Sequence, residues 1–81
     1  MHFTERDVGE FRIYAGAMEE PMGGYVAGVV VHRRRGRGQN PELVFRDDRL
    51  FGGHRFEAAH DALVRALDRG HRAIRALEIA A

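Results

Sequence analysis

The chain has 81 residues, enough for one small domain that buries about 60–65% of the surface its unfolded form exposes. It contains no cysteine, which excludes a disulfide framework and a thiolate metal site, so good packing and self-association are the remaining sources of stability. The net charge is +1, and all thirteen basic residues are arginine. Absence of lysine with many alanines and glycines is typical of a GC-rich genome, so a single arginine indicates little about function.

No targeting or membrane-spanning segment is evident. The first eleven residues lack a basic region followed by an apolar run, and the longest apolar run, residues 25–31, is far too short to span a bilayer. We therefore expect a cytoplasmic protein of bacterial type.

The first part of the chain predicts a leader and a strand. Residues 1–8 show no periodicity and are expected to form a loose leader. Residues 10–15 alternate, with Phe11, Ile13 and Ala15 on one side, which is typical of a half-buried strand. Pro21 and the glycines at 23–24 then predict a hairpin loop longer than two residues.

Residues 25–33 give the strongest strand signal. Three consecutive valines disfavour a helix. Apolar residues occupy both faces, which predicts a central strand, or a strand covered by the helix on one side and by a partner subunit on the other. Gly28 indicates a bulge or a close approach by another backbone. A polar loop at 33–41 separates this strand from a further strand at 42–46, and a turn at 47–48 precedes a short extension around the glycines at 52–53.

Residues 57–77 predict an amphipathic helix. Placed at 100° per residue, its apolar face comprises Ala59, Leu63, Ala66, Leu67, Gly70, Ala73, Ile74 and Leu77. Gly70 could end the helix in a left-handed conformation, with a separate short element after it. We favour one helix of about 20 residues, with Gly70 letting it approach the sheet, because the apolar face and the i,i+4 pairs Asp61/Arg65 and Asp68/Arg72 continue in register.

The predicted fold is therefore α+β, in one domain covering residues 1–81. It is a three-stranded, mostly antiparallel sheet with one long C-terminal helix packed on one face. The leucines of the helix and Ile74 would be buried against the sheet, and each would stabilise the fold by about 1.5–3 kcal/mol.

The most visible charged feature is the arginine loop, which carries Arg33, Arg34, Arg35 and Arg37 without an acid between residues 32 and 38. Such a loop could follow a phosphate backbone, with binding that weakens steeply as salt rises. The alternative is a solvated hairpin loop, and it is favoured because no stacking aromatic residues alternate with these arginines.

A catalytic or metal site has weaker support. Asp47, Asp48, His54 and His60 could meet before the helix, but their spacing matches no ligand pattern and turn preferences explain the aspartates. The chain contains no serine and no cysteine, and its single threonine is Thr4, so the usual nucleophiles are missing. We expect a protein that is not an enzyme and that binds no metal or other cofactor.

The order of strands, aspartate turn, Gly-Gly, phenylalanine and helix resembles the small antitoxin domains of the HicB type, and several small bacterial β-β-β-α families. The resemblance covers about two thirds of the chain, and the residues that carry it are 25–31, 43–45, Asp47, Gly52, Gly53, Phe56, Ala62 and Leu63. HicB-like proteins usually carry a DNA-binding segment after the helix, whereas this chain ends at Ala81. The resemblance therefore implies a partner-binding module rather than an operator-binding protein.

These observations predict a non-enzymatic interaction module, self-associating as a homodimer through the sheet face away from the helix or through a sheet edge. The residues expected at this interface are Tyr14, Val26, Val30 and Val44. A different protein partner is also compatible with such a face. A nucleic-acid-binding or antitoxin-like regulator that uses the arginine loop is the alternative, and no membrane is expected as a partner.

Overall fold

The valine-rich run at residues 25–33 forms the central strand of an antiparallel sheet. In the computed structural model, which describes residues 1–80, β3 (Tyr25–Arg33) lies between β2 (Phe11–Glu19) and β4 (Glu42–Asp47) and pairs with both. The bounds predicted for this strand are confirmed. Gly28 is the predicted close approach, because a Cβ atom there would lie 3.0 Å from the backbone oxygen of Asp48.

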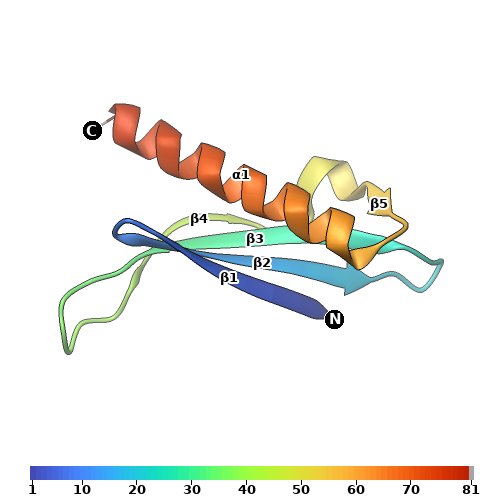
Figure 1. The fold of residues 1–81 in the computed structure, drawn as a ribbon, viewed down its shortest axis with the longest axis horizontal. Coiled ribbons are helices and arrows are strands. Elements are labelled where there is room, and N and C mark those ends of the chain that lie inside the picture. Colours follow the sequence, from blue (N-terminus) through green and yellow to red (C-terminus); the bar gives the residue numbers. More distant parts are fainter. Residues whose placement is uncertain (81) are drawn as a thin grey trace.

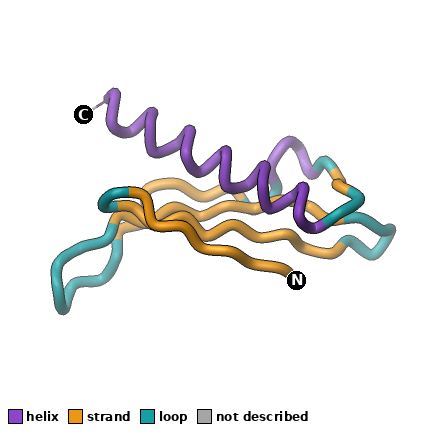
Figure 2. The backbone as a smooth tube through the Cα atoms, viewed as in Figure 1, coloured by secondary structure: helices purple, strands orange, loops and turns teal. Residues whose placement is uncertain are grey.

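The predicted α+β class is confirmed, but the expected number of strands was too low (Figures 1 and 2). The sheet has five strands in the order β1-β2-β3-β4, with the two-residue β5 (Arg55–Phe56) pairing with the start of β3. A short 3-10 helix, η1 (Leu50–Gly53), precedes β5, and α1 (Ala59–Ala80) lies across one face of the sheet.

The expected loose leader is wrong: residues 2–8 form β1 (His2–Val8), an edge strand paired with β2 over seven consecutive positions. Backbone hydrogen bonds hold this strand, so it needs few apolar side chains, and its charged residues suit an exposed edge. The β1–β2 hairpin turns through Gly9 and Glu10, and Gly9 has the positive φ of 57° that a two-residue hairpin turn favours.

Strand β4 contains a bulge that changes which way its side chains point. Its register moves from Phe45 opposite Val31 to Leu43 opposite His32, so Val44 is an extra residue without a partner. Val44 and Phe45 consequently both lie toward α1. The expectation that Val44 faces away from the helix is therefore wrong.

The predicted continuous helix is confirmed, since α1 runs for 22 residues through Gly70. Its contact with the sheet is made by small residues, because the buried positions of α1 are Ala62, Ala66, Gly70, Ala73 and Ile74. The three leucines are only half-buried beside this contact, contrary to the expectation that they are buried against the sheet. A Cβ atom on Gly70 would lie 2.7 Å from Cγ2 of Ile13, so glycine permits the close approach.

The two faces of the sheet are different. The helix face supplies the core below α1, through Phe11, Ile13, Ala15, Ala17, Ala27, Val29 and Val31, together with Leu50 of η1. Side chains alternate along a strand, so the neighbouring positions point to the other side, which we call the open face. The open face carries Phe3, Glu5, Asp7, Arg12, Tyr14, Gly16, Met18, Val26, Gly28, Val30, His32, Leu43 and Arg46.

Candidate functional site

The arginine loop begins at the end of β3, where acidic residues lie beside it. Nη1 of Arg33 lies 3.1 Å from Oε1 of Glu42, and its Nε lies 3.4 Å from Oε1 of Glu10. Nη2 of Arg35 lies 3.9 Å from the same oxygen of Glu42. Two of the four predicted nucleic-acid contacts therefore share nearby carboxylates.

A third arginine of the loop is also occupied. Arg34 lies 3.6 Å from Oδ2 of Asp7 and donates a hydrogen bond to the backbone oxygen of Gly9. Arg37 has no carboxylate within 4.0 Å among residues 1–80. The neighbouring acids reduce the positive potential of the arginine loop, which weakens the case for phosphate contact.

The two aspartates before η1 have local structural roles. Oδ1 of Asp47 accepts a hydrogen bond of 3.1 Å from the backbone N–H of Arg49, as turn aspartates commonly do. Oδ1 of Asp48 lies 3.0 Å from Nε of Arg46, and this hydrogen bond raises the pKa of the Arg46 guanidinium. In these contacts both carboxylates bind arginine residues, and neither binds a histidine.

The two histidines of the hypothetical site have surroundings that differ from those of the aspartates. The ring of His54 contacts the ring of Phe56 edge-on, with 4.7 Å between centroids, and His60 is an exposed residue of the first turn of α1. Within residues 1–80, no three histidine or acidic side chains are grouped as a metal site requires. The four residues that sequence patterns suggested are thus not brought together as metal ligands.

Of the four predicted interface residues, three lie on the expected face and two of these are partly exposed. Tyr14 and Val30 are directly opposite one another on β2 and β3, half-buried on the open face. Val26 is on the same face but is 1% exposed, so it cannot contact a partner without rearrangement. Val44 lies on the helix face, as described above.

The structure adds two exposed apolar residues to the open face that sequence reasoning missed. The side chain of Phe3 is 71% exposed and that of Leu43 is 53% exposed. Gly16 and Gly28 are paired in register in the same row as Phe3, and the side chain of Met18 lies over both. The ring of Phe3 lies beside Gly16, where a Cβ atom would be 3.4 Å from its Cε1.

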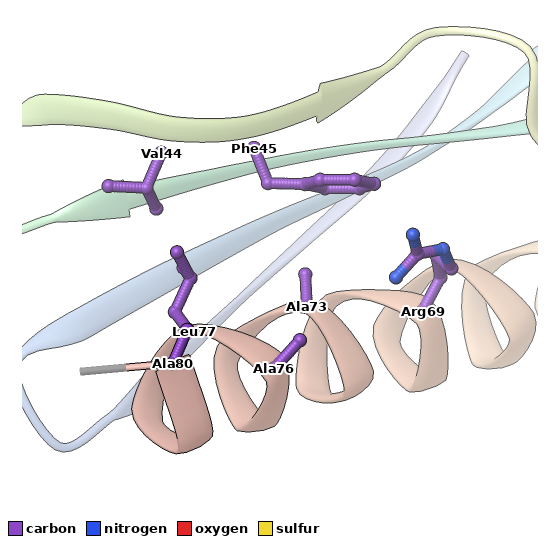
Figure 3. Close-up of a pocket in the computed structure, with 7 residues that line it drawn as sticks. All are labelled: Val44, Phe45, Arg69, Ala73, Ala76, Leu77 and Ala80. Atoms are coloured by element: carbon purple, nitrogen blue, oxygen red, sulfur yellow. The ribbon is translucent and has the colours of Figure 1, made fainter.

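An apolar groove runs between α1 and β4 on the helix face (Figure 3). Its volume is about 240 Å³, and its lining comprises Val44, Phe45, Arg69, Ala73, Ala76, Leu77 and Ala80. Figure 3 shows the side chains of Val44 and Phe45 extending from the strand toward Leu77 and Arg69 on the helix. Six of the seven lining residues are apolar, and the single charge lies at one end.

A second cleft adjoins the groove at Arg69. It is lined by Phe51, Arg65, Asp68, Arg69 and Arg72 and has a volume of about 490 Å³. In this cleft the guanidinium of Arg65 lies 4.7 Å from the centroid of Phe51, and that of Arg69 lies 4.4 Å from the centroid of Phe45. The groove and the cleft together combine an apolar surface with a cationic end.

Only part of this groove could have been predicted from the sequence. The spacing of Arg65, Arg69 and Arg72 on one helix is visible in the printed sequence. The β4 bulge, which turns Val44 toward the helix, has no sequence marker such as glycine. The helix periodicity also did not indicate that α1 would lie over β2 and β3 and leave its β4 side open.

Comparisons with known proteins do not assign a family. No protein-family model, no curated protein and no solved structure matches the chain. Within the part of the chain that the structure describes, no helix is long and apolar enough to cross a membrane.

Proposed function

We propose that the chain is a small, non-enzymatic interaction module that associates with a second copy of itself through the open face of its sheet. The single observation that carries this proposal is the uneven covering of the sheet. Helix α1 covers one face, whereas the open face presents Phe3, Tyr14, Val30 and Leu43 to solvent. Exposed apolar surface on a small domain commonly marks an interface.

The charges on the open face favour a second copy as the partner. Glu5, Tyr14, Val30 and Arg46 form one row across β1, β2, β3 and β4. A twofold axis parallel to the strands would place β1 of one copy over β4 of the other and preserve this row. Glu5 would then face Arg46 of the second copy, and Tyr14 would face its Val30. Arg46 already binds Asp48, but a guanidinium has five N–H donors and retains others for Glu5.

Association through a sheet edge has less support. A bulge on an edge strand disrupts the row of backbone groups that edge pairing requires, and β4 carries one. Strand β1 carries three charged residues, Glu5, Arg6 and Asp7, which also protect an edge. The open face is therefore the favoured surface.

Sedimentation equilibrium over a concentration series tests the proposal. We expect a dimer at high micromolar concentration and a shift toward monomer in Phe3→Asp, by at least about tenfold in Kd, because the change would bury an unpaired charge. Met22→Asp is the matched control, since Met22 is exposed in the β2–β3 hairpin and off the open face. A clean 9.2 kDa monomer at these concentrations would contradict the proposal.

Charge reversal tests the orientation of the two copies. Glu5→Arg and Arg46→Glu are each expected to weaken the dimer, and the double variant should recover most of the loss. If the dimer forms but the double variant is no better than the singles, the copies associate in another orientation.

A further inference from the structure

We propose that the groove between α1 and β4 binds an amphipathic anion, with its aliphatic chain along the groove and its carboxylate or phosphate head at Arg69 and Arg65. This site lies on the helix face of the sheet, so it is independent of self-association through the open face. The site has two parts: an apolar surface, which water solvates poorly, and two arginines that have no carboxylate partner among residues 1–80.

The groove exists because α1 is displaced from β4. Small residues bring the helix down over β2 and β3, where Gly70 contacts Ile13, and no equivalent contact is made with β4. The β4 bulge then turns Val44 and Phe45 toward the space that is left. The result is an open apolar channel whose walls are held by two fixed elements, as small-molecule sites usually are.

The cationic end of the groove is available for a ligand. Among residues 1–80, neither Arg65 nor Arg69 has a carboxylate oxygen within 4.0 Å, whereas Nε of Arg72 lies 2.9 Å from Oδ2 of Asp68. Arg65 and Arg69 instead lie over aromatic rings, which hold a guanidinium in place without occupying its N–H donors. Those donors are suited to bidentate binding of a carboxylate or phosphate.

The electrostatics of α1 give the ligand a direction. The groove runs along α1 from Arg69 to Ala80, where the helix ends, and the carboxyl end of a helix carries a partial negative charge. An anionic head is therefore repelled from the Ala80 end and attracted to the Arg69 end. Eleven residues separate these two positions, which corresponds to roughly 16 Å of helix and suits an extended medium-length alkyl chain.

The charge at one end favours an amphipathic anion over the other occupants of an apolar groove. A neutral alkyl chain would leave Arg69 without an anionic partner. An apolar segment of a second copy would likewise place apolar side chains against the charge of Arg69. Because Arg69 lines both the groove and the adjoining cleft, a single ligand that has a chain and an anionic head satisfies both.

Isothermal titration calorimetry with three probes of the same chain length tests the head group. Decanoate and decyl phosphate are titrated below their aggregation concentrations, and decanol is the neutral comparison. We expect one or both anions to bind at least about tenfold more tightly than decanol. The stronger of the two anions identifies whether the head is a carboxylate or a phosphate. Equal affinity for decanol, or binding only of aggregated probe, would overturn the proposal.

Two variants separate the head site from the channel. Arg69→Gln should weaken binding of the anions by about tenfold and leave decanol unaffected. Ala76→Leu, at an exposed position that lines the groove, should fill the channel and weaken every probe without changing the charge. Arg75→Gln is the matched control, because Arg75 is an exposed arginine of the same helix that lines neither hollow. If Arg75→Gln weakens binding as much as Arg69→Gln, the attraction is general charge and the site is wrong.

Discussion

A Cβ atom on Gly70 would lie 2.7 Å from Cγ2 of Ile13, so the middle of α1 rests on β2 at a separation that only glycine allows. Two further atoms of Ile13 would lie 3.1 and 3.2 Å away. All three atoms belong to a fully buried side chain, which cannot move aside easily. This contact sets the height of the helix above the sheet.

We therefore predict that Gly70→Ala destabilises the protein. Alanine favours a helix over glycine by about 1 kcal/mol, but the overpacked contact costs typically 1–3 kcal/mol and should exceed that gain. Urea denaturation followed by circular dichroism measures the difference. Ala76→Gly, at an exposed position of the same helix, should lose about 1 kcal/mol through propensity alone. A Gly70→Ala variant more stable than the natural chain would show that the helix can shift outward at little cost.

A second prediction concerns Leu50, a core residue that comes from the short helix η1 rather than from the sheet or α1. It lies in η1, is 1% exposed and belongs to the same cluster as Ile13 and Ala66. Leu50→Ala should lower the free energy of unfolding by about 2–5 kcal/mol, a large fraction of the stability of so small a domain. Ile79→Ala, on an exposed position of α1, should stay within about 0.5 kcal/mol of the natural chain in the same urea titration. Equal effects from the two changes would mean that η1 does not pack as described.

The elements that were predictable from sequence are those whose side chains determine them. The valines of β3 and the apolar period of α1 through Gly70 define their own structure, because burial of these side chains stabilises it. Strand β1 was missed because its neighbours' backbone groups hold it and only Phe3 and Val8 are apolar. A strand that is held by pairing with β2 leaves no pattern in its own residues from which it could be predicted.

The direction of several side chains depends on a bulge and on tertiary contacts, neither of which the neighbouring sequence indicates. Val44 was assigned to the wrong face because one bulged residue reverses the alternation on one side of it. Arg65 was expected to pair with Asp61, but its guanidinium lies over Phe51, a residue brought near by tertiary structure. The Asp68–Arg72 pair, which depends only on helix spacing, is present at 2.9 Å. Local geometry was thus predictable, whereas the groove and its arginines were not.

A third prediction concerns the ion pair between Asp7 and Arg12 on the open face. Nε of Arg12 donates a hydrogen bond of 2.7 Å to Oδ1 of Asp7, and this bond lowers the pKa of the Asp7 carboxyl. A carboxyl whose pKa is lower in the folded state stabilises the fold above its unfolded pKa of about 3.9 and loses this contribution as pH falls through the folded value. Asp7→Asn should therefore be less stable than the natural chain at pH 7, by a small amount, and equally stable once the carboxyl is protonated.

Urea midpoints of both proteins, measured in steps from pH 7 into the acid range until the difference stops changing, follow the loss of this contribution. Glu57→Gln is the control, because Glu57 is exposed, lies outside the strands of the sheet and has no ion pair among residues 1–80. A deficit of Asp7→Asn that persists at low pH would assign the effect to packing rather than to charge.

The last prediction concerns the arginine loop, where Asp7, Glu10 and Glu42 lie beside Arg33, Arg34 and Arg35. Glu10 and Glu42 lie beside Arg33 and Arg35, and Asp7, which also binds Arg12, lies beside Arg34, so the loop releases fewer counterions from a phosphate backbone than four unpaired arginines would. We expect fluorescence titrations with single-stranded RNA and duplex DNA to show only weak binding that is lost at physiological salt. Replacing Arg33, Arg34, Arg35 and Arg37 together by glutamine should then change little in titrations at physiological salt. Binding that survives at physiological salt and disappears in this variant would instead establish the loop as a nucleic-acid contact, and removal of Glu10 and Glu42 should then strengthen it further.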